Sequence, residues 1–412
     1  RQGTSTSGNL IKLGTYDGPA SFLICKAMQT FQMQLNNVAI TLNYSDIYPY
    51  LFRYEQTLDQ GRYDLSSTTD MLDDHNDLNF WITQGSARNP LAFYGENSTK
   101  MTRGSFNMEV ITNTPTDASI RINIIEALFC PGVLNWNDEK LKSALTNLQT
   151  NDFTFTFNSN LNNLWSHCSS SPNTITNIDV VLNDNRAPRL LFNYISSDYL
   201  QIIPPTITYD YADIQRYPTS VGNITAGSSF SVSSNNIQLR SVPRCMYVFC
   251  RESNANLSEI STDCFASIDS ITIDFNNRSG LLGSATSNDL YRISRKNGLN
   301  LSWTQWTNYI GSPLCIMFDE DLGTGSNPLD VSGVSGNFQL QMTANFKNIF
   351  NRTVNFTLYV VVITDGTLTI SDNTAILSTS VLSKDDVYKA NNESVYQDYQ
   401  FYRQMTGRGF LQ

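Results

Sequence analysis

The sequence has only two histidines, His75 and His167, in 412 residues. This scarcity removes most routes to general-base and metal catalysis, because histidine is the commonest group in both roles. His167 precedes Cys168, but neighbouring residues of an extended chain point to opposite faces and cannot easily form a nucleophile–base pair. A metalloenzyme of the cupin type would need clustered histidine ligands. We therefore predict a protein that is not an enzyme, with no catalytic residue, no cofactor and no metal site.

Cysteine is also scarce. The seven cysteines are an odd number and lie far apart, which argues against a complete disulfide framework and against a Cys-x-x-Cys zinc pair. Cys245 and Cys250 are five residues apart in an apparent strand, where they would point to opposite faces about 16 Å apart, beyond disulfide reach. We expect buried thiols in a protein made in a reducing compartment.

Charged residues are few, at 16%, and long runs of one sign are missing. The 37 acidic and 27 basic residues give a net charge of -10, so direct binding of nucleic acid is not expected. The longest apolar stretches, residues 245–250 and 356–363, are far shorter than the ~20 residues that cross a bilayer, and we expect a soluble protein. The chain begins at Arg1 without a signal-peptide pattern, so we expect it to be processed or trimmed.

Two acidic clusters and one aromatic cluster are the remaining candidates for a site. One acidic cluster covers residues 70–77; the other, residues 319–330, fails as a calcium loop because Thr324 replaces the turn glycine and Asp330 the final glutamate. We interpret both as solvated loops, although a glycosidase pair of distant carboxylates stays open. The aromatic cluster, which could stack on a sugar but more often packs in a core or interface, consists of Trp303, Trp306 and Tyr309.

Period-two alternation of apolar residues is the dominant pattern, and it predicts strands in both halves. Residues 31–35 alternate Phe, Met and Leu with Gln, and residues 153–157 alternate Phe with Thr. The unbroken apolar run 245–250 predicts a strand that is buried on both faces. Further segments of this kind are residues 106–110, 237–239, 271–275, 338–344 and 354–363.

Helical patterns are few and short. One covers residues 137–148, and the other residues 287–297, with Ser287 as a possible N-cap and Asn297-Gly298 as the stop. Because strands do not alternate regularly with helices, the pattern argues against a parallel α/β sheet. Both helices are expected in loop insertions.

The alternation stops at residues 196–205, where paired prolines favour extended backbone. We predict two domains, residues 1–200 and 201–385, and a C-terminal arm, residues 386–412. About eight strands in each half fit an all-β pair of tandem eight-stranded jelly-roll barrels with short helices in loop inserts. A propeller would show a repeat of ~40–50 residues, and immunoglobulin-like sandwiches would need only ~100 residues each.

Several short motifs follow one another along the chain. In the second half they are Ser-Val-Pro-Arg-Cys-Met-Tyr-Val (241–248), Ile-Asp-Phe-Asn-Asn-Arg-Ser-Gly-Leu-Leu (273–282), Arg-Lys-Asn-Gly (295–298), Gly-Ser-Pro-Leu (311–314) and Gly-Asn-Phe-Gln (336–339). In the first half they are Asn-Pro-Leu-Ala-Phe-Tyr-Gly (89–95), Arg-Gly-Ser-Phe (103–106) and Glu-Ala-Leu-Phe (126–129). Their co-linear order within residues 30–365 resembles the major capsid proteins of virophages and Polinton-like viruses.

The resemblance implies a double jelly roll that forms pseudo-hexameric homotrimers, or capsomers, and tiles the facets of an icosahedral double-stranded DNA virus capsid. It implies neighbouring capsomers and a single jelly-roll penton protein as partners. The tyrosine-rich residues 388–402 could dock on neighbours or on minor capsid or cement proteins. The resemblance places the protein in the virion, assembled inside the infected host cell.

Two other functions remain as alternatives. A jelly-roll spike that binds a glycan or receptor is suggested by Trp303 and Trp306. A β-sandwich glycoside hydrolase is suggested only by the acidic loops.

Overall fold

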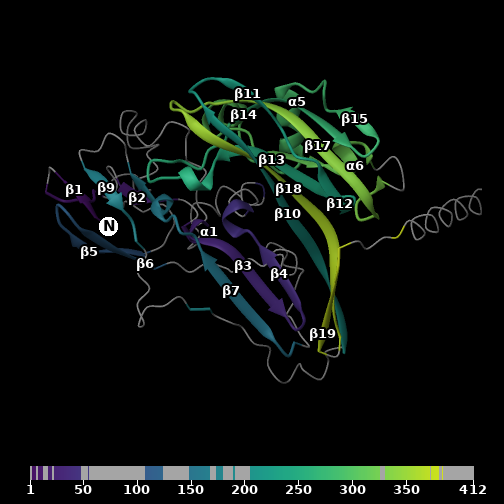
Figure 1. Ribbon diagram of the computed structural model, residues 1–412, viewed down its shortest axis with the longest axis horizontal. Coiled ribbons are helices and arrows are strands. Elements are labelled where there is room, and N and C mark those ends of the chain that lie inside the picture. The colour runs from purple at the N-terminus through teal and green to yellow at the C-terminus, as the bar shows by residue number, and fades with distance from the viewer. Residues whose placement is uncertain are drawn as a thin grey trace, which may run out of the picture.

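The protein is seen in a computed structural model that describes residues 2–5, 8–12, 17–20, 23–47, 54, 107–123, 148–167, 173–179, 189–190, 205–324, 330–371, 373–379 and 383. Antiparallel strands prevail and the helices are short, which confirms the predicted all-β class (Figure 1). No helix in this part of the chain is both long enough and apolar enough to cross a bilayer.

The second half of the chain forms two antiparallel sheets. Their strands are β10 (Thr206–Ile224), β11 (Ser229–Ser233), β12 (Ile237–Ser241), β13 (Cys245–Glu252), β14 (Ser267–Phe275), β15 (Arg278–Leu281), β16 (Leu314–Met317), β17 (Ser335–Lys347), β18 (Val354–Ser371) and β19 (Thr374–Ser378). One sheet has the order β10-β18-β13-β16 and the other β11-β17-β14-β15, while β12 also pairs with β17 and β19 with β18.

The order of these strands is that of a jelly roll. β11 and β12 pair with successive stretches of β17, and β14 pairs with the opposite edge of β17, so β11 and β12 count as one interrupted strand. Numbered along the chain without β19, the strands then lie in the orders 1-8-3-6 and 2-7-4-5. The second half therefore contains the expected eight-stranded barrel.

Alternation along the strands builds the core of this barrel. In β17, Phe338, Leu340, Met342 and Ala344 are buried while the residues between them are exposed, as predicted. The ring of Phe338 stacks on Phe275 of β14 with the ring centroids 5.7 Å apart. All eight residues of β13 are buried, which confirms the prediction that this strand is covered on both faces.

The described part of the first half is made of smaller sheets. Its elements are β1 (Gln2–Thr4), β2 (Asp17–Pro19), α1 (Leu23–Ala27), β3 (Met28–Leu35), β4 (Val38–Leu42), β5 (Asn107–Asn113), β6 (Ala118–Asn123), β7 (Asn151–Phe157), η2 (Asn162–Leu164), β8 (Trp165–His167) and β9 (Thr174–Asn177). The sheets are β4-β3-β7, β5-β6, β2-β8 and β1-β9. β3 buries Phe31, Met33 and Leu35 as predicted, whereas Phe157 at the end of β7 is 48% exposed.

The helices of the second half are α5 (Ser287–Lys296), α6 (Phe318–Asp321), the 3-10 turn η4 (Asn254–Asn256) and the π-helical turn η5 (Gln305–Tyr309). α5 confirms the helix predicted over residues 287–297. The predicted N-cap is wrong by one residue, because Thr286 accepts a hydrogen bond from the Asp289 N–H and Asp289 bonds back to the Thr286 N–H. Ser287 instead donates its hydroxyl to the Ile268 carbonyl. The other predicted helix, residues 137–148, lies almost wholly outside the described residues.

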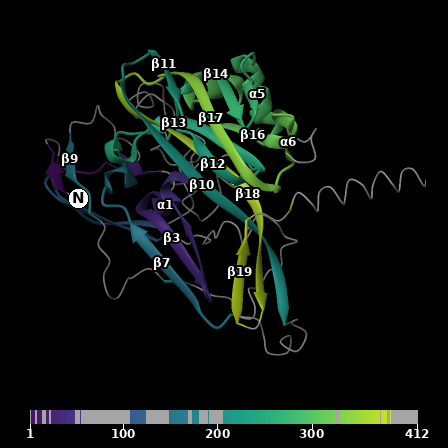
Figure 2. The same cartoon turned by 45° about the vertical axis from the view of Figure 1, so that its right-hand side comes forward.

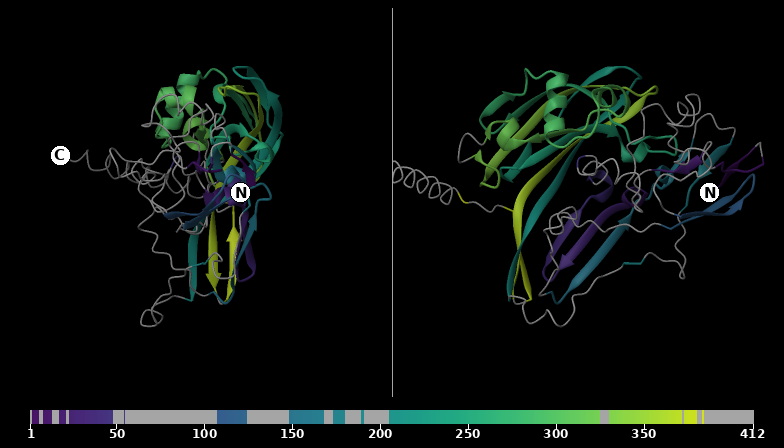
Figure 3. Two further views of the ribbon diagram at one scale, coloured as in Figure 1. Left: turned by 90° about the vertical axis from the view of Figure 1, so that its left-hand side faces the viewer. Right: turned by 180° about the vertical axis from the view of Figure 1, so that it is seen from behind.

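A long ribbon extends from the barrel toward the first half. β10 and β18 pair over their whole lengths, and β19 pairs with the C-terminal end of β18 (Figure 2). The ribbon reaches the turn between β3 and β4, where the Ala375 N–H donates to Asn37 Oδ1 at 2.7 Å. Seen from behind, the sheet β4-β3-β7 lies below the barrel and beside this ribbon (Figure 3). The two halves are therefore joined by an extension of the barrel sheet as well as by their facing surfaces.

Candidate functional site

The two halves meet across the face of β13 that carries Tyr247 and Arg251. Tyr247 makes an edge-on ring contact with Tyr54, with the centroids 5.1 Å apart. Arg251, the penultimate residue of β13, binds Asp46 of the first half. We call this contact region the seam.

Asp46 is the centre of the first ion-pair group in the seam. Its carboxylate contacts Arg251 Nη2 at 2.9 Å and Arg216 Nη1 at 2.5 Å. The side chains of Asp46 and Arg251 are 7% and 8% exposed, and that of Arg216 is 27% exposed. Arg216 also donates to Asn43 Oδ1, and the Arg251 guanidinium lies over the Tyr359 ring. One carboxylate therefore joins two strands of the barrel, β10 and β13, to the first half.

Lys26 and Asp263 form a second ion pair across the seam. The ammonium of Lys26, in α1, is 2.7 Å from Asp263 Oδ2, and the two side chains are 9% and 8% exposed. The Lys26 carbonyl accepts a hydrogen bond from Asn158 Nδ2, which fixes the end of α1 against the residue after β7. Buried charges are costly unless they are paired, so each pair strongly favours this one arrangement of the halves.

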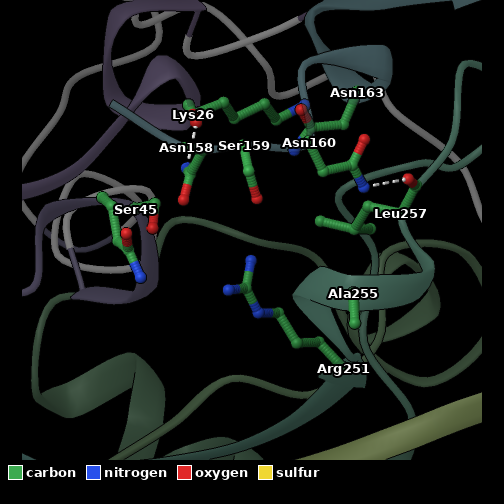
Figure 4. A pocket seen from close by; sticks show the side chains of 10 residues that line it. Lys26, Ser45, Asn158, Ser159, Asn160, Asn163, Arg251, Ala255 and Leu257 are labelled. Carbon is green, nitrogen blue, oxygen red and sulfur yellow. Dashed lines mark hydrogen bonds between the residues drawn. The ribbon is translucent and has the colours of Figure 1, made fainter. Parts of the chain in front are cut away.

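A polar cavity of about 180 Å³ is lined by one member of each ion pair, Lys26 and Arg251 (Figure 4). The Arg251 guanidinium points into it from the second half, and Ser159 and Asn158 point toward it from the first. Asn163 Oδ1 is buried there without a hydrogen-bond partner in the described part of the chain. The cavity is lined by Lys26, Gln29, Ser45, Asn158, Ser159, Asn160, Asn163, Arg251, Ala255 and Leu257. The lining holds no histidine, cysteine or carboxylate, so it offers no evident base for acid–base catalysis.

Tyr54 is the main uncharged anchor of the seam. Its hydroxyl donates to the Pro313 carbonyl at 2.8 Å and lies 3.4 Å from Ser294 Oγ. Burial raises the pKa of Tyr54 well above its usual value, so the hydroxyl keeps its proton. Gly298, the predicted helix stop, has φ +107°. The Tyr54 carbonyl oxygen packs close to it, only 3.3 Å from where a Cβ would lie.

An apolar core runs through the seam without a break. One cluster of buried side chains contains Phe31, Met33 and Leu35 of β3 together with the interior of the barrel. The first half therefore packs its sheet against the second half through side chains as well as through ion pairs.

His167, considered above as a base and set aside, has buried polar partners. It is buried in β8, where its Nδ1 lies 2.9 Å from Asp17 Oδ1 and its Nε2 lies 3.1 Å from the Asn173 carbonyl. Trp165 Nε1 also donates to Asp17 Oδ1. Burial favours a higher pKa for Asp17, but hydrogen bonds from His167 and the Lys12 N–H outweigh it and lower the pKa below its usual value. Cys168 and His75 lie outside the described residues.

The described cysteines are buried thiols that form no disulfide, as expected. They are Cys25, Cys245, Cys250, Cys264 and Cys315. Burial raises the pKa of Cys250 well above its usual value, which keeps it a thiol and a packing residue. Cys130 lies outside the described residues.

The acidic residues of the 319–330 cluster accept hydrogen bonds or form ion pairs within the protein. Asp319 Oδ1 accepts from Thr324 Oγ1 and from the Ser332 N–H, and Asp321 Oδ2 accepts from the Met317 N–H. Asp330 pairs with Arg278 at 3.2 Å. Within the described ranges no three His, Cys, Asp or Glu side chains gather as a metal site. Residues 70–77 lie outside the described part.

The predicted aromatic cluster is divided between core and surface. Trp306 is fully buried and donates its Nε1–H to the Pro313 carbonyl. Trp303 stacks on Trp306 with the centroids 5.9 Å apart and is 41% exposed, and Tyr291 packs edge-on against it. Packing is thus confirmed for Trp306, whereas Trp303 presents its ring to solvent and Tyr309 is partly buried.

Large apolar side chains are exposed on both halves. Those more than a third exposed among the described residues are Val110, Ile111, Phe157, Leu190, Trp303 and Ile376. Val110 and Ile111 are adjacent in β5, where the register with β6 shifts at a β-bulge. These side chains are candidates for contacts with other molecules.

Sequence reasoning missed the buried charges of the seam. Lys26, Asp46 and Asp263 are single charged residues in ordinary surroundings, and their partners are distant in sequence. The one available signal was Arg251-Glu252, a charged pair directly after the apolar run 245–250, because a strand buried on both faces must pair any charge that it carries.

Comparison with known proteins gives consistent matches. A family model described as the major capsid protein V20 C-terminal domain matches residues 214–312. The putative capsid protein V20 of Sputnik virophage is 30% identical over 415 residues, which cover 93% of this chain and 68% of the relative.

Solved structures match over nearly the whole chain. The cryo-EM structure of the Sputnik virophage has a TM-score of 0.73 at 27% identity, covering 94% of this chain and 82% of that chain. The crystal structure of the mavirus major capsid protein has a TM-score of 0.70 at 16% identity, covering 94% and 83%, and shares the fold. These matches confirm the predicted double jelly-roll fold and the resemblance to virophage major capsid proteins. The chain belongs to the V20 family of virophage major capsid proteins, which are structural proteins of the virion and not enzymes.

Proposed function

We propose that three copies of this chain form a homotrimeric capsomer of pseudo-hexagonal outline, and that these capsomers tile the facets of an icosahedral capsid. The observation that carries the proposal is the seam, where two buried ion-pair groups and a shared apolar core hold the halves as one unit. A facet tile must keep its outline under contact from all sides. Three such two-barrel units around a threefold axis present six barrels, and the closed symmetry satisfies their lateral surfaces.

Each part of the chain has its own place in this proposal. Residues 1–200 and 201–385 supply one barrel each, and residues 386–412 act as an arm toward neighbouring capsomers or minor capsid or cement proteins. A separate single jelly-roll penton protein fills the vertices. The net charge of -10 supports a shell that leaves DNA packaging to other proteins.

The bulge in β5 is the strongest candidate for a contact between copies. Val110 and Ile111 are 42% and 47% exposed, and the other edge of β5 has no strand paired to it among the described residues. At the far end of the ribbon, Ile376 of β19 is 62% exposed. A cyclic trimer needs two different surfaces on each copy, and exposed apolar side chains occur on both halves.

The mass of the purified chain in solution tests the proposal. Light scattering after size exclusion should give about three times the 46.3 kDa of one chain. The double variant Val110→Asp, Ile111→Asp should weaken the trimer, whereas Thr208→Asp, at an exposed hydroxyl of β10, should leave it intact. A monomer at high concentration, together with images of the particle that place this protein outside the facets, would refute the proposal.

A further inference from the structure

The buried ring of His167 has hydrogen-bond acceptors at both of its nitrogens. His167 is 5% exposed, with Asp17 Oδ1 at Nδ1 and the Asn173 carbonyl oxygen at Nε2. A carboxylate and a peptide carbonyl accept hydrogen bonds and do not donate them. A neutral imidazole has one N–H and would turn a lone pair toward one of these oxygens, whereas the imidazolium donates to both.

A protonated Asp17 that donates to a neutral His167 does not fit the contacts of the carboxyl group. Its Oδ1 accepts from Trp165 Nε1 at 3.0 Å, and its Oδ2 accepts from the Lys12 N–H at 2.9 Å. Both oxygens are therefore already acceptors. Asp17 is 0% exposed, so a carboxylate there requires a positive partner in contact, and the described structure places His167 in that position.

We propose that His167 is a proton-dependent clasp, in which the imidazolium joins Asp17 of β2 to the segment at Asn173, and loss of one proton releases that segment. The proton that leaves is the one on Nε2, because the Nδ1 proton remains on the bond to the Asp17 carboxylate. It passes to water or hydroxide, and the Nε2 lone pair then faces the Asn173 carbonyl.

The clasp holds three parts of the chain together. Asn173 Nδ2 donates to the carbonyls of Asn9 and Leu10, both at 2.9 Å, so the segment at Asn173 anchors the start of the chain. The His167 N–H donates to the Glu259 carbonyl of the second half at 2.8 Å. Release of the Asn173 segment should therefore loosen the chain start and one edge of the contact with the barrel.

The direction of the pH effect follows from proton counting. The closed clasp needs a proton on both ring nitrogens and the open clasp needs one proton fewer, so by linkage the stabilisation from the clasp falls as the pH rises. The charged residues on the described segments around the ring are Asp17 in contact, Glu259 opposite the backbone of β8, and Lys12. Because the pKa of Asp17 lies below its usual 3.8, Asp17 keeps its charge in mildly acidic solution. The clasp is therefore closed in weak acid and opens toward alkaline pH.

Selective labelling can test the protonation state, because the chain has only two histidines. We suggest ¹⁵N labelling of the histidine rings in the full chain, with His75→Gln used to assign the signals. At about pH 5.5 both ring nitrogens of His167 should carry protons in the folded protein. A His167 ring with a single N–H at that pH would overturn the proposal.

Thermal unfolding gives a second readout. Between about pH 5.5 and pH 8 the melting temperature of the wild type should fall by roughly 1–2 °C more than that of His167→Gln. His75→Gln should behave as the wild type. If His167→Gln shows the same pH dependence as the wild type, the clasp does not contribute and the proposal fails. If His167→Gln does not fold, the labelling experiment on the wild type decides.

Discussion

Asp46→Asn should be among the most damaging single changes of a polar residue in the protein. The substitution keeps the shape of the side chain and removes the one charge that both Arg251 and Arg216 contact. Removing one partner of a buried pair costs about 3–5 kcal/mol, because the remaining charge stays buried. The contact with Arg216 adds only about 0–1 kcal/mol, because that side chain is 27% exposed and can turn to water.

Urea denaturation followed by tryptophan fluorescence measures this effect. With a slope of about 3 kcal/mol/M, a loss of ~3 kcal/mol moves the midpoint down by about 1 M. The matched control is Glu109→Gln, which removes a carboxylate bound to Arg121 at 2.6 Å where the side chains are 57% and 31% exposed. That pair should contribute about 0–1 kcal/mol.

Two outcomes would refute the reasoning on Asp46. If Asp46→Asn costs no more than Glu109→Gln, burial of the seam does not strengthen its ion pairs. A second test replaces the pair by apolar residues, Asp46→Leu with Arg251→Met, and should recover most of the stability that Asp46→Asn loses. If the double variant is less stable than Asp46→Asn alone, the loss comes from shape and not from an unpaired buried charge.

Three further changes test the barrel and the seam. Gly311→Ala should destabilise the protein by more than ~3 kcal/mol or prevent folding, which would be seen as loss of soluble protein. Gly311 has φ +90°, and an added Cβ would overlap the Phe265 backbone carbonyl. The control is Gly227→Ala, because Gly227 has φ +72° but open space around it. Thr286→Ala should lower the melting temperature by an amount equivalent to about 1 kcal/mol through loss of the capping box, and Thr286→Ser should retain most of the cap. Tyr54→Phe should cost only about 0.5–1 kcal/mol in urea denaturation, because the Pro313 carbonyl keeps its bond from Trp306; a larger loss would mean that the hydroxyl positions the seam.

The regular parts of the fold followed from the sequence because their signals are local. β12, β14 and β17 have the predicted alternation, and β13 has the predicted burial on both faces. α5 was found from its cap region, but Ser287 and Thr286 are both good N-cap residues, and only the backbone geometry separates them. The orders 1-8-3-6 and 2-7-4-5 pair strands distant in sequence and are not encoded in any one segment.

The seam could not be predicted for a related reason. Asp46 and Arg251 are 205 residues apart, and nothing near either residue indicates the other. His167 could be recognised as isolated, but its partner Asp17 is 150 residues away. Isolated charges in sequence are usually solvated, so their burial becomes visible only when the two halves are placed together.

The boundary that the sequence suggests between the halves is not an energetic boundary. Residues on both sides of it belong to one buried apolar cluster, which includes Phe31 of β3 and Phe249 of β13. The ribbon of β10, β18 and β19 adds hydrogen bonds beyond the barrel, as far as Asn37. If each half were an independent domain, the outer face of β13 would be polar, but all eight of its residues are buried. The first half covers part of that face, where Tyr54 packs on Tyr247 and Asp46 binds Arg251, so the two barrels of this capsid protein pack as one unit.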